Sequence, residues 1–187
     1  MDGDEEVSAD KPAPERWLRG PVAGIPALLQ PVAHGLLQCR DEVSHHLRGL
    51  TADQIWASPA RAASVGYHLR HAAGSLDRLF TYARGESLSP AQRVSLAKES
   101  DPGPLPESAA ALLELFDQAV TSALAQLRGT KETTLLDARA VGRAGLPSTV
   151  VGLLFHAAEH TQRHVGQLIT TIKLTGPGRV AGSDGPH

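Results

Sequence analysis

The segment Thr149–Leu174, TVVGLLFHAAEHTQRHVGQLITTIKL, decides how this chain is interpreted. Its apolar residues recur every three or four positions, which is the spacing of one face of an α-helix. The expected inward line has six members: Leu153, Ala157, His160, His164, Leu168 and Ile172. The segment therefore predicts a long helix that packs against a core and carries two histidines on its apolar side.

Two imidazoles one turn apart on an apolar face need partners for their ring nitrogens, and a metal ion can serve both at once. A lone histidine in such a place is more often a core side chain satisfied by hydrogen bonds. For His160 and His164 together, the spacing favours metal binding. His156 stands a further four residues before this pair.

Three more segments show helical spacing, and they predict an all-α fold. A first helix is expected from about residue 26 or 31 to 48, a second from 59 to 84, a third from 106 to 128, and the last from about 148 to 175. The third should turn these residues inward: Leu112, Leu115, Phe116, Ala119, Ala123 and Leu127. Four helices of this length are most simply arranged as a four-helix bundle. No segment shows sustained alternation of apolar and polar residues, so no sheet is expected.

The link between the second and third helices, residues 86–105, is longer than antiparallel neighbours require. A link of this length can cross the whole bundle, which would let the second and third helices run parallel. It has room for a short helix near residues 90–99. The link 130–146 is also long, and long loops often border functional sites.

Composition limits the function classes. The 187 residues carry 18 basic and 20 acidic side chains, so no excess of positive charge indicates nucleic-acid binding. No stretch approaches the roughly 20 apolar residues of a membrane span, and the acidic beginning of the chain lacks the apolar core of a signal peptide. A single cysteine, Cys39, excludes an intrachain disulfide and favours a cytoplasmic location. We expect a disordered acidic tail (1–19), one bundle domain (20–175) and a flexible tail (176–187).

A third metal ligand should come from a facing helix, because metal sites in bundles are built from inward side chains of neighbouring helices. The second predicted helix offers His71 and, one turn earlier, His68, and the spacing alone does not separate them. Three neutral imidazoles would leave coordination positions open, as in catalytic sites. Imidazole suits zinc, nickel, copper and iron, so the ligand type does not select the metal. We expect His45 and His46 to lie on the surface.

Other catalytic patterns are weak. His156-Ala-Ala-Glu159-His160 matches the H-x-x-E-H pattern of inverted zinc proteases, but no glutamate follows His160 to serve as a distant third ligand. The chain has no G-x-S-x-G motif, and Cys39 has no evident base near it in the sequence. We therefore expect a structural cysteine and no protease.

Two of these segments resemble the DinB-like (DinB/YfiT) superfamily. The run Gly66-Tyr-His-Leu-Arg-His-Ala-Ala-Gly-Ser-Leu-Asp-Arg-Leu79 is similar to that family's second helix, and His160-x-x-x-His164-x-Gly166-Gln167 is similar to its H-x-x-x-H-x-G-Q element. The resemblance covers about residues 20–175. It implies a bundle with parallel second and third helices, and it implies that His71, His160 and His164 hold a divalent ion such as zinc or nickel, with water completing the shell.

The resemblance also implies a range of functions. Several members of the superfamily use the metal to activate a low-molecular-weight thiol such as bacillithiol or mycothiol, among them S-transferases and a thiol-dependent maleylpyruvate isomerase, while many have no known reaction. We expect a metal-dependent enzyme, either a thiol S-transferase or a metal-assisted hydrolase, that acts on a small molecule. The alternatives are a metal-binding stress-response bundle without catalysis and a plain helical interaction protein.

Several finer expectations accompany the resemblance. Gly166 would let a neighbouring helix or loop approach closely, and Gln167 would form a hydrogen bond near the site. His34, His68 and His156 lie outside the implied ligand set, so they either surround the ligands or lie partly exposed on helix flanks. Apolar residues on the flanks of the predicted helices make a homodimer reasonable; these are Leu37, Leu113 and Leu154.

Overall fold

A computed structural model describes residues 13–104 and 106–175, and its fold is all-α as predicted. The four long helices are α1 (Gln30–His46), α3 (Val65–Ala83), α5 (Ala109–Gly129) and α6 (Val150–Thr175). The shorter elements are the helices α2 (Ala52–Trp56) and α4 (Pro90–Ala97), the 3-10 turns η1 (Arg16–Leu18), η2 (Ala27–Leu29), η3 (Pro59–Arg61) and η4 (Glu132–Thr134), and the strands β1 (Ala138–Val141) and β2 (Leu146–Thr149).

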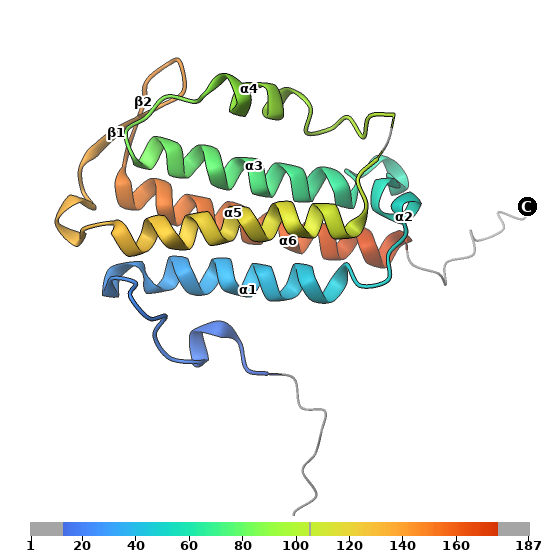
Figure 1. The fold of residues 1–187 in the computed structure, drawn as a ribbon, viewed down its shortest axis with the longest axis horizontal. Coiled ribbons are helices and arrows are strands. Elements are labelled where there is room, and N and C mark those ends of the chain that lie inside the picture. Colours follow the sequence, from blue (N-terminus) through green and yellow to red (C-terminus); the bar gives the residue numbers. More distant parts are fainter. Residues whose placement is uncertain (1–12, 105, 176–187) are drawn as a thin grey trace, which may run out of the picture.

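The long helices form a bundle in which α3 and α5 run parallel (Figure 1). The segment between them, which we call the crossover (residues 86–108), returns along the length of the bundle and contains α4, as its length predicted. Helices α1 and α6 run in the opposite direction to α3 and α5. This order brings α6 beside α3, the two helices from which the predicted metal ligands come.

Serine caps set where three helices begin. The side chains of Ser64, Ser89 and Ser108 each accept a hydrogen bond from the backbone N–H three residues later. The predicted start of the second long helix at residue 59 is therefore too early. Residues 59–61 form the separate turn η3, in which Ala60 has a positive φ of 48°, and the capped helix begins only at Val65.

The expectation that the chain has no sheet is wrong for one short segment. Strands β1 and β2 pair antiparallel within the second long link, with Val141 opposite Leu146. Glycines with positive φ, Gly142 and Gly145, lie in the connection that reverses the chain. Strands of four residues are too short to show a sustained alternation of apolar and polar residues, so this hairpin has no periodic signal in the sequence.

The core largely follows the predicted apolar faces, with two differences. Leu115 was expected to face inward but is 43% exposed, while Leu112 and Phe116 beside it are fully buried. Leu37 and Leu154 were expected on helix flanks but are buried in the core, so they cannot form a dimer surface. The argument for a homodimer from these two residues is therefore wrong, and the homodimer itself stays a prediction.

The predicted tails lie mostly outside the described residues, which exclude 1–12 and 176–187. Within residues 13–19 of the predicted tail, η1 is present and the Arg16 guanidinium lies 2.6 Å from the Asp41 carboxylate on α1. Among the described helices, none has the length and apolar character needed to span a bilayer.

Candidate metal centre

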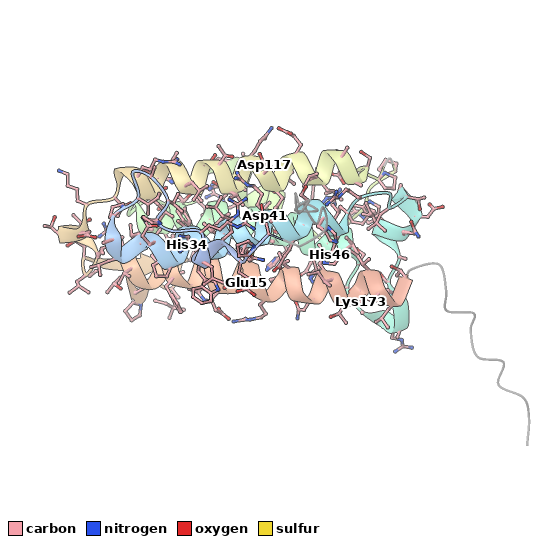
Figure 2. All side chains as sticks on the ribbon, turned by 90° about the horizontal axis from the view of Figure 1, so that it is seen from below. Glu15, His34, Asp41, His46, Asp117 and Lys173 are labelled. Carbon is pink, nitrogen blue, oxygen red and sulfur yellow. The ribbon has the colours of Figure 1, made fainter. Side chains whose placement is uncertain are left out.

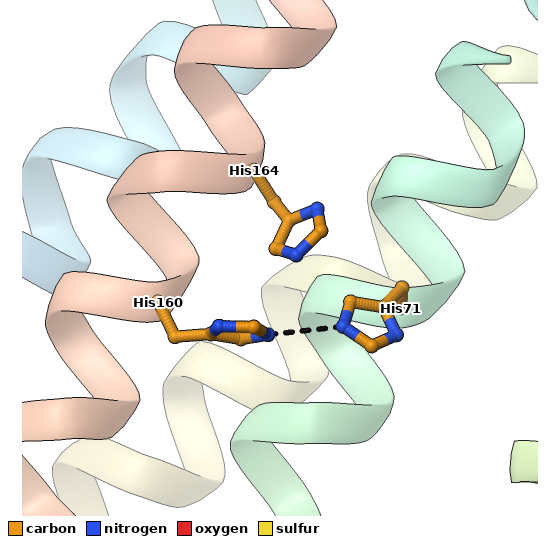
Figure 3. Close-up of side chains that lie close together, drawn as sticks. All are labelled: His71, His160 and His164. Atoms are coloured by element: carbon orange, nitrogen blue, oxygen red, sulfur yellow. Dashed lines mark hydrogen bonds between the residues drawn. The ribbon is translucent and has the colours of Figure 1, made fainter. Parts of the chain in front are cut away.

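His71, His160 and His164 converge between α3 and α6 (Figure 3). Each offers one ring nitrogen, and the three nitrogens all lie within 4.8 Å of one another. The Nε2 atoms of His71 and His160 are 2.9 Å apart. All three side chains are half-buried, so the cluster lies at the edge of the core where a small molecule could reach it. The structure thus brings together the three histidines that the resemblance implied.

The position of the pair on α6 differs in one respect from the predicted inward line. The centre of the buried face runs through Thr161 and Val165, which are 0% and 2% exposed, while His160 and His164 occupy the neighbouring line at the edge of that face. A helix face that packs against two neighbours is wider than a single line of residues. The sequence therefore placed the histidines on the correct side of α6 but too deep in the core.

The cluster fits a transition-metal ion. Histidine nitrogens bind zinc at about 2.0–2.1 Å, so ligands of a tetrahedral site lie about 3.4 Å apart. The Nε2 atoms of His71 and His160 are closer than this, at 2.9 Å. No pair among the three nitrogens is separated by more than 4.8 Å, so the ideal spacing falls within the observed range. Small side-chain rotations would therefore bring the three nitrogens to metal-binding distance.

The local environment keeps the pair on α6 in the neutral form that binds metal. Burial, followed by the repulsion that His71, His160 and His68 exert when they are protonated, lowers the pKa of His164 from 6.5 to about 4. Burial and the charge of His71 also lower the pKa of His160. Because a metal competes with protons for the same lone pair, a lowered pKa removes part of that competition near neutral pH.

His68 lies next to the cluster but is not one of the three histidines whose ring nitrogens converge. Its side chain is buried, and its Nδ1 lies 3.0 Å from Nδ1 of His164. If His164 binds metal through Nε2, its Nδ1–H can donate to His68, whose pKa is lowered by burial. The structure therefore separates His71 from His68, a choice that the sequence spacing had left open.

A buried carboxylate completes the surroundings of His71. Glu99 follows α4 in the crossover, is 5% exposed, and places Oε2 at 2.7 Å from Nδ1 of His71. Its Oε1 lies 2.6 Å from Nη1 of Arg78, which is also buried. Sequence reasoning missed both residues, because a glutamate at the end of a short predicted helix is usually exposed and nothing in the spacing links it to α3.

The remaining histidines of the described chain are not among the three whose nitrogens converge, although the ring of His156 lies 5.4 Å, centroid to centroid, from that of His160. His156 is exposed and lies 3.4 Å from the carboxylate of Glu159, so the H-x-x-E-H pattern contributes only His160 to the centre. On α1, His34 and His46 lie along the helix on either side of Asp41 (Figure 2). His34 contacts the carbonyl oxygen of Gly20 through Nε2 at 3.0 Å.

Two cavities open near these residues. A hollow of about 510 Å³ beside His68 is also lined by Arg163, Gly166 and Gln167, and the hydrogen bond expected of Gln167 stays a prediction. Gly166 does not admit a close neighbour, since no described atom lies within 4 Å of the place where its Cβ would be; that expectation is wrong. A larger cavity of about 730 Å³ lies between α3, α5 and the crossover and is lined in part by Glu99. Neither cavity is lined by any of the three clustered histidines. The smaller hollow adjoins the cluster through His68, whose Nδ1 lies 3.0 Å from Nδ1 of His164, and the larger cavity adjoins it through Glu99, which contacts His71.

Comparisons with known proteins agree with this architecture. The sequence profile described as the DinB superfamily matches residues 36–168, a range that contains all three clustered histidines. Among solved structures, the chain is similar to one titled "Crystal structure of the conserved protein of locus from Enterococcus faecalis", with a TM-score of 0.62 and 19% sequence identity over 79% of this chain and 96% of that one. At this identity the similarity concerns the fold alone. The search of curated proteins found no match.

Proposed function

The chain belongs to the DinB superfamily, and from this membership and the histidine cluster we propose that it is a metal-dependent enzyme acting on a small molecule. The observation that carries the proposal is the convergence of His71, His160 and His164 from two helices. Three histidine ligands leave coordination positions open for a substrate or water, as in catalytic rather than structural sites. The family membership and the cluster are both compatible with metal binding.

Thiol transfer is the reaction that we favour. A divalent ion bound at the cluster would lower the pKa of a thiol or water in an open position and so supply a nucleophile near neutral pH. The protein's own contribution is to hold three imidazoles together at the edge of the core. His68 orients His164 from one side, and Glu99 contacts His71 from the other.

The hollow beside His68 supports a polar small-molecule substrate. Arg163 and Gln167 line it with a guanidinium and an amide, which are groups that bind carboxylates and peptide-like amides. Low-molecular-weight thiols carry such groups. The cytoplasmic location and the homodimer belong to this proposal as predictions from the sequence.

A metal-binding bundle without catalysis is the second candidate, and it rests on the same cluster. Metal-loaded protein should consume a low-molecular-weight thiol, bacillithiol or mycothiol, in the presence of an electrophile such as 1-chloro-2,4-dinitrobenzene. We expect turnover with zinc or nickel, loss of turnover in His164→Ala, and retention in His156→Ala, which changes an exposed histidine on the same helix. A parallel assay with p-nitrophenyl acetate tests hydrolysis.

The outcomes separate the candidates. Metal binding without turnover of either substrate would favour the non-catalytic bundle. Failure to bind zinc and nickel would leave the helical interaction protein. Turnover that survives His164→Ala would exclude the cluster as the reaction centre.

A further inference from the structure

Glu99 is unusual among the carboxylates of the described chain, because it is the only one that is buried. A carboxylate removed from water loses several kcal/mol of hydration free energy unless charged and hydrogen-bonding partners replace the water. Glu99 has two such partners, and both belong to α3. The crossover therefore reaches into the bundle at this residue, directly against a helix that carries a candidate metal ligand.

The two oxygens of Glu99 have separate partners. Oε1 accepts from the guanidinium of Arg78 at 2.6 Å, and Oε2 lies 2.7 Å from Nδ1 of His71. A carboxylate can only accept, so Nδ1 of His71 must carry the proton. This leaves Nε2 of a neutral His71 with its lone pair directed toward His160. Ser75 fits the same assignment, since its Oγ can accept from Arg78 and donate to Nε2 of His71.

The backbone of α3 leaves space for this arrangement. A Cβ on Gly74 would lie 2.7 Å from both Nη1 of Arg78 and Oε1 of Glu99. Glycine inside a helix costs about 1 kcal/mol relative to alanine. The chain thus accepts this cost at position 74 of α3, where any larger side chain would come between the guanidinium of Arg78 and the carboxylate of Glu99.

We propose that Glu99 is a positioning residue for His71 and that the crossover is thereby a working part of the metal centre. Glu99 fixes the Nδ1-protonated tautomer and the ring orientation of His71, and Arg78 holds Glu99 in place. The effect of Glu99 on metal affinity rests on the proposed metal-binding function. The tautomer that Glu99 imposes on His71 applies to the metal-free protein as well. Partners of this kind typically change metal affinity by about 10- to 100-fold when they are removed.

The test compares Glu99→Gln with Glu107→Gln. Glu107 also lies in the crossover and pairs with Arg70 of α3, but its side chain is 39% exposed and contacts none of the clustered histidines. Zinc affinity is measured by competition with a chromophoric chelator on the full chain. We expect Glu99→Gln to weaken zinc binding by about 10- to 100-fold and Glu107→Gln to leave it unchanged. Gly74→Ala, which displaces the same carboxylate without removing it, should weaken zinc binding in the same direction.

A second measurement reports on positioning rather than on folding. Long-range ¹H–¹⁵N correlation spectra identify which ring nitrogen of His71 carries the proton. We expect the Nδ1–H tautomer in metal-free wild-type protein and a mixture of tautomers in folded Glu99→Gln.

Four results would overturn the proposal: zinc affinity of Glu99→Gln within about twofold of wild type, an equal loss in Glu107→Gln, an Nε2-protonated His71 in the metal-free wild type, or an unmixed Nδ1–H tautomer in Glu99→Gln. If wild-type protein binds no zinc, the proposed function fails, and the tautomer measurement still decides the role of Glu99.

Discussion

Replacing Arg78 by methionine tests whether the carboxylate beside the metal centre is buried as described. Methionine retains much of the arginine stem but removes the guanidinium that lies 2.6 Å from Glu99. The side chains of Arg78 and Glu99 are 10% and 6% exposed, so the remaining carboxylate would keep its buried position without its cationic partner. Removing one partner of a buried pair costs about 3–5 kcal/mol. We expect about 3 kcal/mol, the lower end of that range, because Nδ1 of His71 still satisfies one oxygen.

The free energy of unfolding is measured by urea denaturation of metal-free protein at neutral pH. For a chain of this size a loss of about 3 kcal/mol corresponds to a decrease in Tm of about 6–12 °C. Glu86→Gln is the control, because its partner Arg84 and Glu86 itself are both largely exposed, and we expect no measurable change.

A double variant, Arg78→Met with Glu99→Leu, separates charge from packing. It should be more stable than Arg78→Met alone, because no uncompensated charge remains in the interior. The reasoning would be refuted if Arg78→Met behaved like the Glu86 control. It would also be refuted if the double variant lost as much stability as the two single variants added together.

Three further predictions follow from particular residues. Gly35→Ala should stabilise the protein by up to about 1 kcal/mol, since the nearest atoms to its new Cβ belong to the flexible side chain of Gln162, at 3.5 Å. Gly74→Ala should instead destabilise the protein, because its Cβ would lie 2.7 Å from Arg78 and Glu99. A higher free energy of unfolding for Gly74→Ala than for wild type would contradict the packing described. Metal-free protein should lose stability as pH falls from about 7 to 5, because the lowered pKa of His164, about 4 against 6.5, makes the unfolded chain bind more protons in that interval. Urea denaturation of wild type and His164→Asn at both pH values checks this, and an equal pH dependence in the two proteins would contradict it. Cys39 should react with a thiol reagent only after unfolding, because burial raises its pKa to about 12; rapid reaction of the native protein would disprove its burial.

The sequence predicted the fold well because helical spacing is a local and repeated signal. The length of residues 86–105 even predicted the parallel course of α3 and α5. The β1–β2 hairpin was missed, since its strands contain only four residues each and no alternation accumulates over that length. Leu115 was placed inward because its spacing fits α5, but the cavity under the crossover leaves it 43% exposed.

The candidate site was only partly predictable. His160 and His164 lie four residues apart on one helix, so their proximity follows from helix geometry alone. The choice of His71 over His68 needed either the family resemblance or the packing of α3 against α6, because both lie on the same side of their helix. Glu99 could not be predicted at all, since its contact with His71 depends on how the crossover docks, and docking of this kind leaves no periodic pattern in the sequence.

The metal content of the protein tests the central claim most directly. Protein produced without a histidine tag and supplied with zinc and nickel is analysed for transition metals as wild type, His160→Ala and His156→Ala. We predict about one ion per chain in wild type and in His156→Ala, and little or none in His160→Ala. Of the two substituted histidines, only His160 belongs to the cluster. Absence of metal from the wild type, or equal metal content in all three proteins, would contradict the assignment of His71, His160 and His164 as a metal centre.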